Sequence, residues 1–187
     1  DFSLVYPIAR GTAPAFLMVW SILFLREDLT PGGILGILLI VGGMIVIGTT
    51  SLVQTQGRRV RLKGIFTALT VALIISLYTF VDGSAVQNGS TLPYALTMFA
   101  LVPFLTTTYN LRRFGWKRFL SAWDGPRLLL ILAAILGVVA YLLALFAYTI
   151  APVSYSGAIR EMSVVIGAFL GWQFLGESMG GMRVLGS

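Results

Sequence analysis

Two ionisable residues, Arg160 and Glu161, lie side by side in an apolar stretch near the end of the sequence. A charge in the hydrocarbon region of a bilayer costs at least ~2.5–3.5 kcal/mol on insertion scales, so such residues are usually paired or functional. Arg160 lies eight residues past Pro152, or about 12 Å along a helix, where snorkelling to the headgroups is difficult. We therefore expect Arg160 to bind an anion, either Glu161 or the carboxylate or phosphate of a solute.

Glu161 is the one carboxylate that lies well inside an apolar block. Burial favours the neutral form of a carboxyl group, whereas a nearby arginine favours the ionised form. A carboxylate balanced in this way can take up and release a proton, as transport driven by a proton gradient requires. A static ion pair explains the same residues. Because adjacent helical side chains point about 100° apart, the partner of Glu161 can also come from another helix.

Arg10 has the same setting as Arg160, because the two stretches are copies of one another. Shifting the chain by 150 positions, without a gap, superposes Arg10 on Arg160 and Glu27 on Glu177. Arg10 lies close to the expected start of its helix, so snorkelling explains it equally well. We interpret Glu27 and Glu177 as loop charges at the membrane surface.

Other polar side chains in the apolar blocks complete the candidate site. Asp82 ends its predicted span and shares a helix face with Tyr78, four residues earlier; helix termination alone also explains Asp82. Tyr141 and Tyr148 mark one face of another block, and converging tyrosines would suit an amphipathic or aromatic metabolite. The residues expected to face a cavity or to couple transport are Arg10, Tyr78, Asp82, Tyr155, Arg160 and Glu161.

The composition is that of a membrane protein. Hydrophobic residues make up 57% of the chain and charged residues 11%, against roughly 45–50% and about 25% in soluble domains. One soluble core could not bury so much apolar surface, so the excess must face lipid. The chain has no cysteine and no histidine, which excludes disulfides, imidazole bases and the usual zinc ligands. We expect no cofactor and no metal.

Six apolar blocks have the length of a bilayer-spanning helix, roughly 17–25 residues. They are continuous and do not alternate as barrel strands do. Small residues at four-residue spacing, such as Gly32 and Gly36, are expected at close helix contacts. The predicted spans are 7–25, 33–52, 64–81, 93–109, 128–150 and 153–175.

Cations between the blocks indicate orientation rather than nucleic-acid binding, although the formal charge is +6. They concentrate in two loops, at 58–63 and 112–127, that lie two spans apart and therefore on one side. Positive loops are usually cytoplasmic. Trp116, Phe119 and Leu120 recur at helical spacing opposite the cations of the second loop, which predicts either a short interfacial helix or an ordinary aromatic belt.

The repeat also predicts architecture. Five spans separate the start of the first copy from the second, and an odd number makes the two copies cross the membrane in opposite directions. Inverted repeats of this kind underlie many secondary transporters. The unmatched spans lead us to expect a fragment of a molecule with about five plus five spans.

With these motifs in view, the chain resembles the EamA-type transporters of the drug/metabolite transporter superfamily. The resemblance rests on YPIARGTAP and FLREDLTP in the first copy, YTFVDG, and APVSYSGAIREMSVV with FLGES in the second. Arg26 stands where glycine is common in the family's Leu-Gly-Glu, whereas Gly176 keeps that pattern. The basic loops, placed inside, would put the termini of a ten-span molecule outside, although the family is usually drawn with both inside.

The resemblance implies an all-α integral membrane protein of ten helices in two inverted five-helix halves around a central cavity. Residues 1–53 would be the end of the first repeat, 54–63 the basic inter-repeat loop and 64–187 the second repeat with a truncated last span. The resemblance also implies a multi-pass protein of the cell membrane that exports or exchanges small organic solutes by alternating access. Transport would be coupled to protons if Glu161 titrates. A P-loop is absent from the sequence. A membrane-embedded enzyme for lipid-linked substrates and a non-transporting scaffold are the alternatives; oligomeric state stays open.

Overall fold

A computed structural model describes residues 2–53, 62–121 and 125–175, and every regular element in these ranges is helical. Helices satisfy their own backbone hydrogen bonds, as an apolar environment demands. The all-helical prediction is therefore confirmed for the described residues, and each predicted block corresponds to a helix. The elements are α1 (Phe2–Trp20), the π-helix η1 (Ser21–Leu25), α2 (Pro31–Val53), α3 (Leu62–Asn88), α4 (Thr91–Ser121), α5 (Arg127–Ile150) and α6 (Val153–Leu175).

Three helical stretches within the described residues are long and apolar enough to cross a membrane: Gly64–Asn88, Thr91–Ser121 and Arg127–Ile150. Shorter apolar stretches run over Ala9–Leu25 and Pro31–Met44. The start of α2 is fixed locally, because the Thr30 hydroxyl accepts the Gly33 N–H at 3.1 Å. Thr30 thus acts as an N-cap, and Pro31 occupies the first helical position, where its missing N–H is tolerated.

Two helices differ from their predicted spans. The expectation that Asp82 ends its span is wrong, because α3 continues to Asn88 and buries Asp82 inside it. Packing explains the continuation, since Gly83 fits directly against the side chain of Val153 on α6. α4 extends past its predicted end, with a break at Gly115 (φ 77°, ψ 163°) that separates a short terminal segment.

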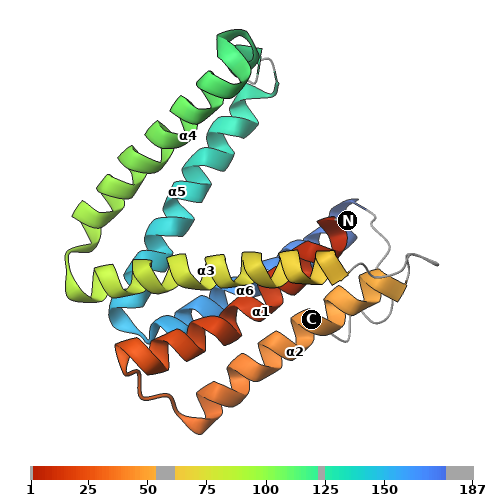
Figure 1. The fold of residues 1–187 in the computed structure, drawn as a ribbon, viewed down its shortest axis with the longest axis vertical. Helices are drawn as coiled ribbons and strands as arrows, with labels where there is room; N and C mark the ends of the chain where they lie inside the picture. Colours follow the sequence, from red (N-terminus) through yellow and green to blue (C-terminus); the bar gives the residue numbers. More distant parts are fainter. Residues whose placement is uncertain (1, 54–61, 122–124, 176–187) are drawn as a thin grey trace. The chain divides into compact units, whose positions relative to one another are not determined.

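The chain divides into two compact units. Residues Asp1–Ser84 and Ala151–Ser187 form the first, in which α1 packs against both α2 and α6. Its apolar core contains Ile37 and Val41 of α2 and Ala158 of α6. Residues Ala85–Ile150 form the second unit, where α4 and α5 make a helical hairpin (Figure 1).

Helices α1 and α6 run antiparallel (Figure 1). Arg10 meets Glu161, and Leu17 lies against Gly157. Residue numbers therefore rise along α1 as they fall along α6. This direction is the one expected if the two helices belong to oppositely oriented copies of one unit.

Close helix contacts occur at glycines other than those predicted. A Cβ built at Gly157 would lie 2.3 Å from Leu17 Cδ2, and one at Gly33 would lie 2.1 Å from the Tyr155 hydroxyl. A side chain at either position would therefore require the neighbouring side chain, Leu17 or Tyr155, to move. The expectation for Gly32 and Gly36 is wrong, since no atom lies within 4 Å of a Cβ built at either.

The π-helix η1 ends on a strained residue. Arg26 has φ 55° and ψ 40°, in the left-handed region, and its backbone N–H bonds to the Ser21 carbonyl. This conformation costs an L-residue roughly 1–2 kcal/mol, whereas glycine adopts it freely. Arg26, which stands at the glycine position of Leu-Gly-Glu, therefore lowers the stability of the folded chain relative to glycine.

Replacing Arg26 tests this strain. Arg26→Gly and Arg26→Ala remove the same guanidinium, but only glycine relieves the left-handed backbone. We expect the unfolding temperature of the glycine variant in detergent to lie about 2–4 °C above that of the alanine variant. This shift corresponds to a difference of about 1 kcal/mol in the free energy of unfolding for a chain of this size. An alanine variant that melts at or above the glycine variant contradicts the strain.

Candidate functional site

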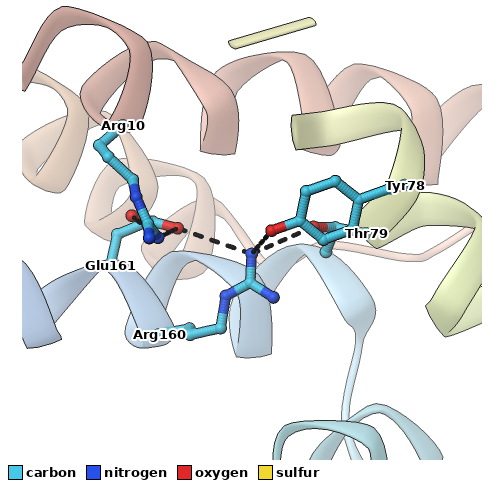
Figure 2. A network of polar contacts seen from close by, with 5 residues as sticks. All are labelled: Arg10, Tyr78, Thr79, Arg160 and Glu161. Atoms are coloured by element: carbon cyan, nitrogen blue, oxygen red, sulfur yellow. Dashed lines mark hydrogen bonds and ion pairs between the residues drawn. The ribbon is translucent and has the colours of Figure 1, made fainter. Parts of the chain in front are cut away.

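The centre of the site is the buried carboxylate of Glu161 on α6. Its side chain is 2% exposed, and Arg10 Nη1 on α1 lies 3.1 Å from each carboxylate oxygen. Figure 2 shows the Arg10 side chain extending from α1 directly onto Glu161. The partner of Glu161 thus comes partly from another helix, as the angle between neighbouring side chains had led us to expect.

Arg160 is the second cation at this carboxylate. Its Nη2 lies 3.7 Å from Glu161 Oε1 and donates hydrogen bonds to Thr79 Oγ1 at 3.1 Å and the Tyr78 hydroxyl at 3.3 Å (Figure 2). The guanidinium also lies 5.8 Å from the centre of the Tyr78 ring. Arg160 therefore connects α6 to α3, while Arg10 connects α6 to α1.

This arrangement, the Arg10–Glu161–Arg160 triad, places one negative and two positive charges together. Removing one partner from a buried ion pair is costly, because it leaves an uncompensated charge in a medium that solvates it poorly. Both arginines direct at least one nitrogen onto protein oxygens. The geometry is thus a paired charge cluster that joins three helices.

A small cavity borders the triad. It lies between α1, α3 and α6, and its volume is about 10 Å³. One water molecule needs roughly 10–15 Å³, so this cavity has room for one water at most and is far smaller than a pocket for a whole ligand. Its lining residues are Ala13, Pro14, Leu17, Ile75, Ser76, Thr79, Gly157, Arg160 and Glu161.

Two polar lining residues were missed by sequence reasoning. Ser76 and Thr79 lie three residues apart on one face of α3, and both are 1% exposed. Ser76 Oγ accepts a hydrogen bond from Trp20 Nε1 at 3.1 Å, and Thr79 binds Arg160. Two hydroxyl residues three positions apart in an apolar span were the sequence signal that could have identified Ser76 and Thr79 as part of the site.

The structure brings together four of the six predicted residues: Arg10, Tyr78, Arg160 and Glu161. Asp82 is buried, with 5% exposure, but is not among the residues that line the cavity. Tyr155 lies elsewhere on α6. Its hydroxyl accepts the Thr30 N–H at 2.8 Å and lies 3.2 Å from Thr30 Oγ1.

Tyr155 belongs to a second cluster at the start of α6, which we term the α6 clamp: Glu27, Thr30, Ser154 and Tyr155. Glu27 accepts hydrogen bonds from the Ser154 hydroxyl at 2.6 Å, from the Ser154 N–H at 3.3 Å and from the Val153 N–H. These N–H groups belong to the first turn of α6, which has no helical partner for them and favours a negative charge.

Glu27 lies in the loop between η1 and α2, as interpreted, but it is not a free loop charge. The residue is half-buried, and its carboxylate caps α6. Its repeat counterpart, Glu177, lies outside the described residues.

The other predicted tyrosines lie in the second unit. The Tyr141 ring meets Phe99 edge-on, with 5.6 Å between ring centres. Tyr148 is 1% exposed, and its carbonyl accepts a hydrogen bond from Gln87. Packing between α4 and α5 accounts for the Tyr141 ring.

The triad predicts a non-additive pair of substitutions. Arg10→Gln should lower the unfolding temperature, because it deprives the buried Glu161 of its closer cation; the cost is at most about 3 kcal/mol, since Arg10 is partly exposed. Adding Glu161→Gln to that variant should restore part of the loss. Thermal unfolding of both singles and the double in detergent measures this, and additive losses contradict a coupled pair.

The α6 clamp predicts a contrast between adjacent acids. Glu27→Ala should cost about 0.5–2 kcal/mol, as loss of a helix cap does. Asp28→Ala is the matched control, because Asp28 is exposed and makes no hydrogen bond or ion pair with the described residues. Thermal unfolding should separate the two, and equal unfolding temperatures would show that Glu27 does not hold α6.

Comparison with known proteins identifies a family for most of the chain. No curated protein and no solved structure matches the chain. The model of the EamA-like transporter family matches residues 62–187, which include α3 to α6 and therefore Tyr78, Thr79, Arg160 and Glu161. The chain, with its apolar membrane-crossing helices, belongs to the EamA-like transporter family and is a multi-pass membrane protein.

Proposed function

We propose that this chain forms part of a secondary transporter that moves small organic solutes by alternating access, with Glu161 as the proton-coupling group. The observation that supports this best is a buried carboxylate shared by two arginines at the edge of a cavity between three helices. Ionisable residues inside a membrane-spanning bundle commonly mark substrate or proton pathways. Membership of the EamA-like family supports transport as the activity.

Inverted repeats would supply the two alternating conformations. Arg10 and Arg160 occupy equivalent positions in the two copies, and their helices run antiparallel. Sites in inverted-repeat transporters lie where the repeats meet. The triad meets this requirement, because it joins the Arg10 helix of one proposed repeat to the Arg160 helix of the other.

Protonation of Glu161 would change the forces between these helices. An ionised carboxylate attracts both guanidiniums, whereas a neutral one keeps only weaker hydrogen bonds. Proton uptake would thus release α1 from α6 and leave both guanidiniums without their shared anion, with Arg160 lining the cavity. An anionic group of the solute could then take the place of the carboxylate, and its departure would favour loss of the proton.

In this cycle, the α6 clamp would keep the site closed on the side where α6 begins. Val153 lies eight residues before Glu161, or about 12 Å along the helix axis. The hydrogen bonds of Glu27 and Tyr155 hold the start of α6 against the loop before α2. Opening at this end requires breaking these bonds, while the triad holds the helices further along.

Accessibility of the cavity tests alternating access without a known solute. The chain has no native cysteine, so Ser76→Cys places a single thiol in the cavity lining. In membrane vesicles of each orientation, membrane-impermeant maleimide should label this thiol from both sides. Ile74→Cys, on the same helix but 58% exposed, is the matched lipid-facing control and should react poorly. Labelling of the Ser76→Cys variant from one side only contradicts alternating access.

The same assay tests coupling. Acidification should shift the ratio of labelling between the two sides in the Ser76→Cys chain. Adding Glu161→Gln should fix the ratio at its low-pH value, because glutamine mimics the neutral acid. Asp82→Asn tests the other buried carboxyl group. A pH response that survives Glu161→Gln and disappears in Asp82→Asn assigns the coupling to Asp82 instead.

A further inference from the structure

A second group of cations lies at the end of α4, in the second unit. Gly115 breaks the helix there with a positive φ of 77°. Residues 109–121 contain four cations and no acidic residue. The cations are Arg112, Arg113, Lys117 and Arg118, all of them exposed.

Two of these cations converge on one aromatic ring. The guanidinium carbons of Arg113 and Arg118 lie 5.4 and 5.5 Å from the centre of the Phe114 ring. Arg113 is held further by Tyr109, whose hydroxyl accepts its hydrogen bond and whose ring lies 5.7 Å away. The aromatic contacts therefore hold two like charges beside the same ring, one from each side of the Gly115 break.

Neither guanidinium has a carboxylate partner among the described residues, in contrast to Arg10 and Arg160. Two positioned guanidiniums provide the paired N–H donors that phosphate oxygens accept with high specificity. The Phe114 ring carries no competing acceptor. The arrangement is thus complementary to a phosphate with a single negative charge.

Neighbouring apolar side chains indicate that the phosphate belongs to a lipid. Trp116 stacks on Phe119, with ring centres 6.1 Å apart, and is 62% exposed. Leu120 is 47% exposed. Trp and other amphipathic side chains favour the headgroup level of a bilayer, and this segment ends a helix long enough to cross one.

We propose that Arg113, Arg118 and the Phe114 ring form a binding site for the headgroup phosphate of one anionic phospholipid. Trp116 and Leu120 contact the upper acyl chains of the same lipid. A choline headgroup is disfavoured, because its own cation would face four others. This site does not depend on the proposed transport cycle.

Fluorescence quenching measures this binding. The 187-residue chain is reconstituted in phosphatidylcholine vesicles that contain brominated phosphatidylglycerol or, separately, brominated phosphatidylcholine. The difference between the wild-type chain and Trp116→Phe isolates quenching at Trp116. We expect the phosphatidylglycerol to bind preferentially, and the double variant Arg113→Gln/Arg118→Gln to lower that preference by about tenfold, since each basic residue contributes to attraction by an anionic surface.

The matched control is Arg112→Gln/Lys117→Gln, which removes the same charge from the same segment but leaves the Phe114 contacts intact. It should lower the preference by less than about threefold. Circular dichroism should show both double variants folded, because all four residues are exposed. Equal losses in the two double variants, equal binding of the two lipids, or full competition by inorganic phosphate overturns the proposal.

Discussion

The shared carboxylate of Glu161 is the interaction on which the structure of the first unit depends. In an apolar environment two arginines cannot remain without anions, and Glu161 is the residue that both reach. Arg10 approaches from α1, while Arg160 lies next to Glu161 on α6 and extends to α3. One buried charge therefore fixes the mutual position of three helices that have little hydrophobic force between them in lipid.

The rest of the unit is built around this constraint. Gly157 lets α1 approach α6 closely enough for the ion pair to form, since a side chain there would overlap Leu17. Glu27 caps the start of α6 and fixes its axial position. The π-helix before that loop ends in a left-handed Arg26, so the chain accepts local strain to bring Glu27 to the helix end. Gly157, the Glu27 cap and the strained Arg26 thus all help to position α6 against α1.

Much of this was predictable from the sequence, because the signals are local. Block length and hydropathy predicted the helices, and the isolated charges indicated Arg10, Arg160 and Glu161 as candidate site residues. The pairing of Glu161 with Arg10 was not predicted, because snorkelling explained Arg10 equally well. The helix end at Asp82 was predicted wrongly, because local polarity was given more weight than the packing of Gly83 against Val153. The roles of Glu27 and Tyr155 depend on contacts between segments more than 120 positions apart. No local pattern specifies such contacts.

The most direct test of the account is the relative direction of α1 and α6 in a membrane. In the cysteine-free chain, Leu17→Cys combined with Gly157→Cys should form a disulfide rapidly on mild oxidation, because these positions touch. Leu17→Cys combined with Ile166→Cys should not, since residue 166 lies nine residues further along α6, about 13 Å away. Preferential cross-linking of positions 17 and 166 would mean that the two helices run parallel, and would contradict both the contact of Leu17 with Gly157 and the inverted repeats.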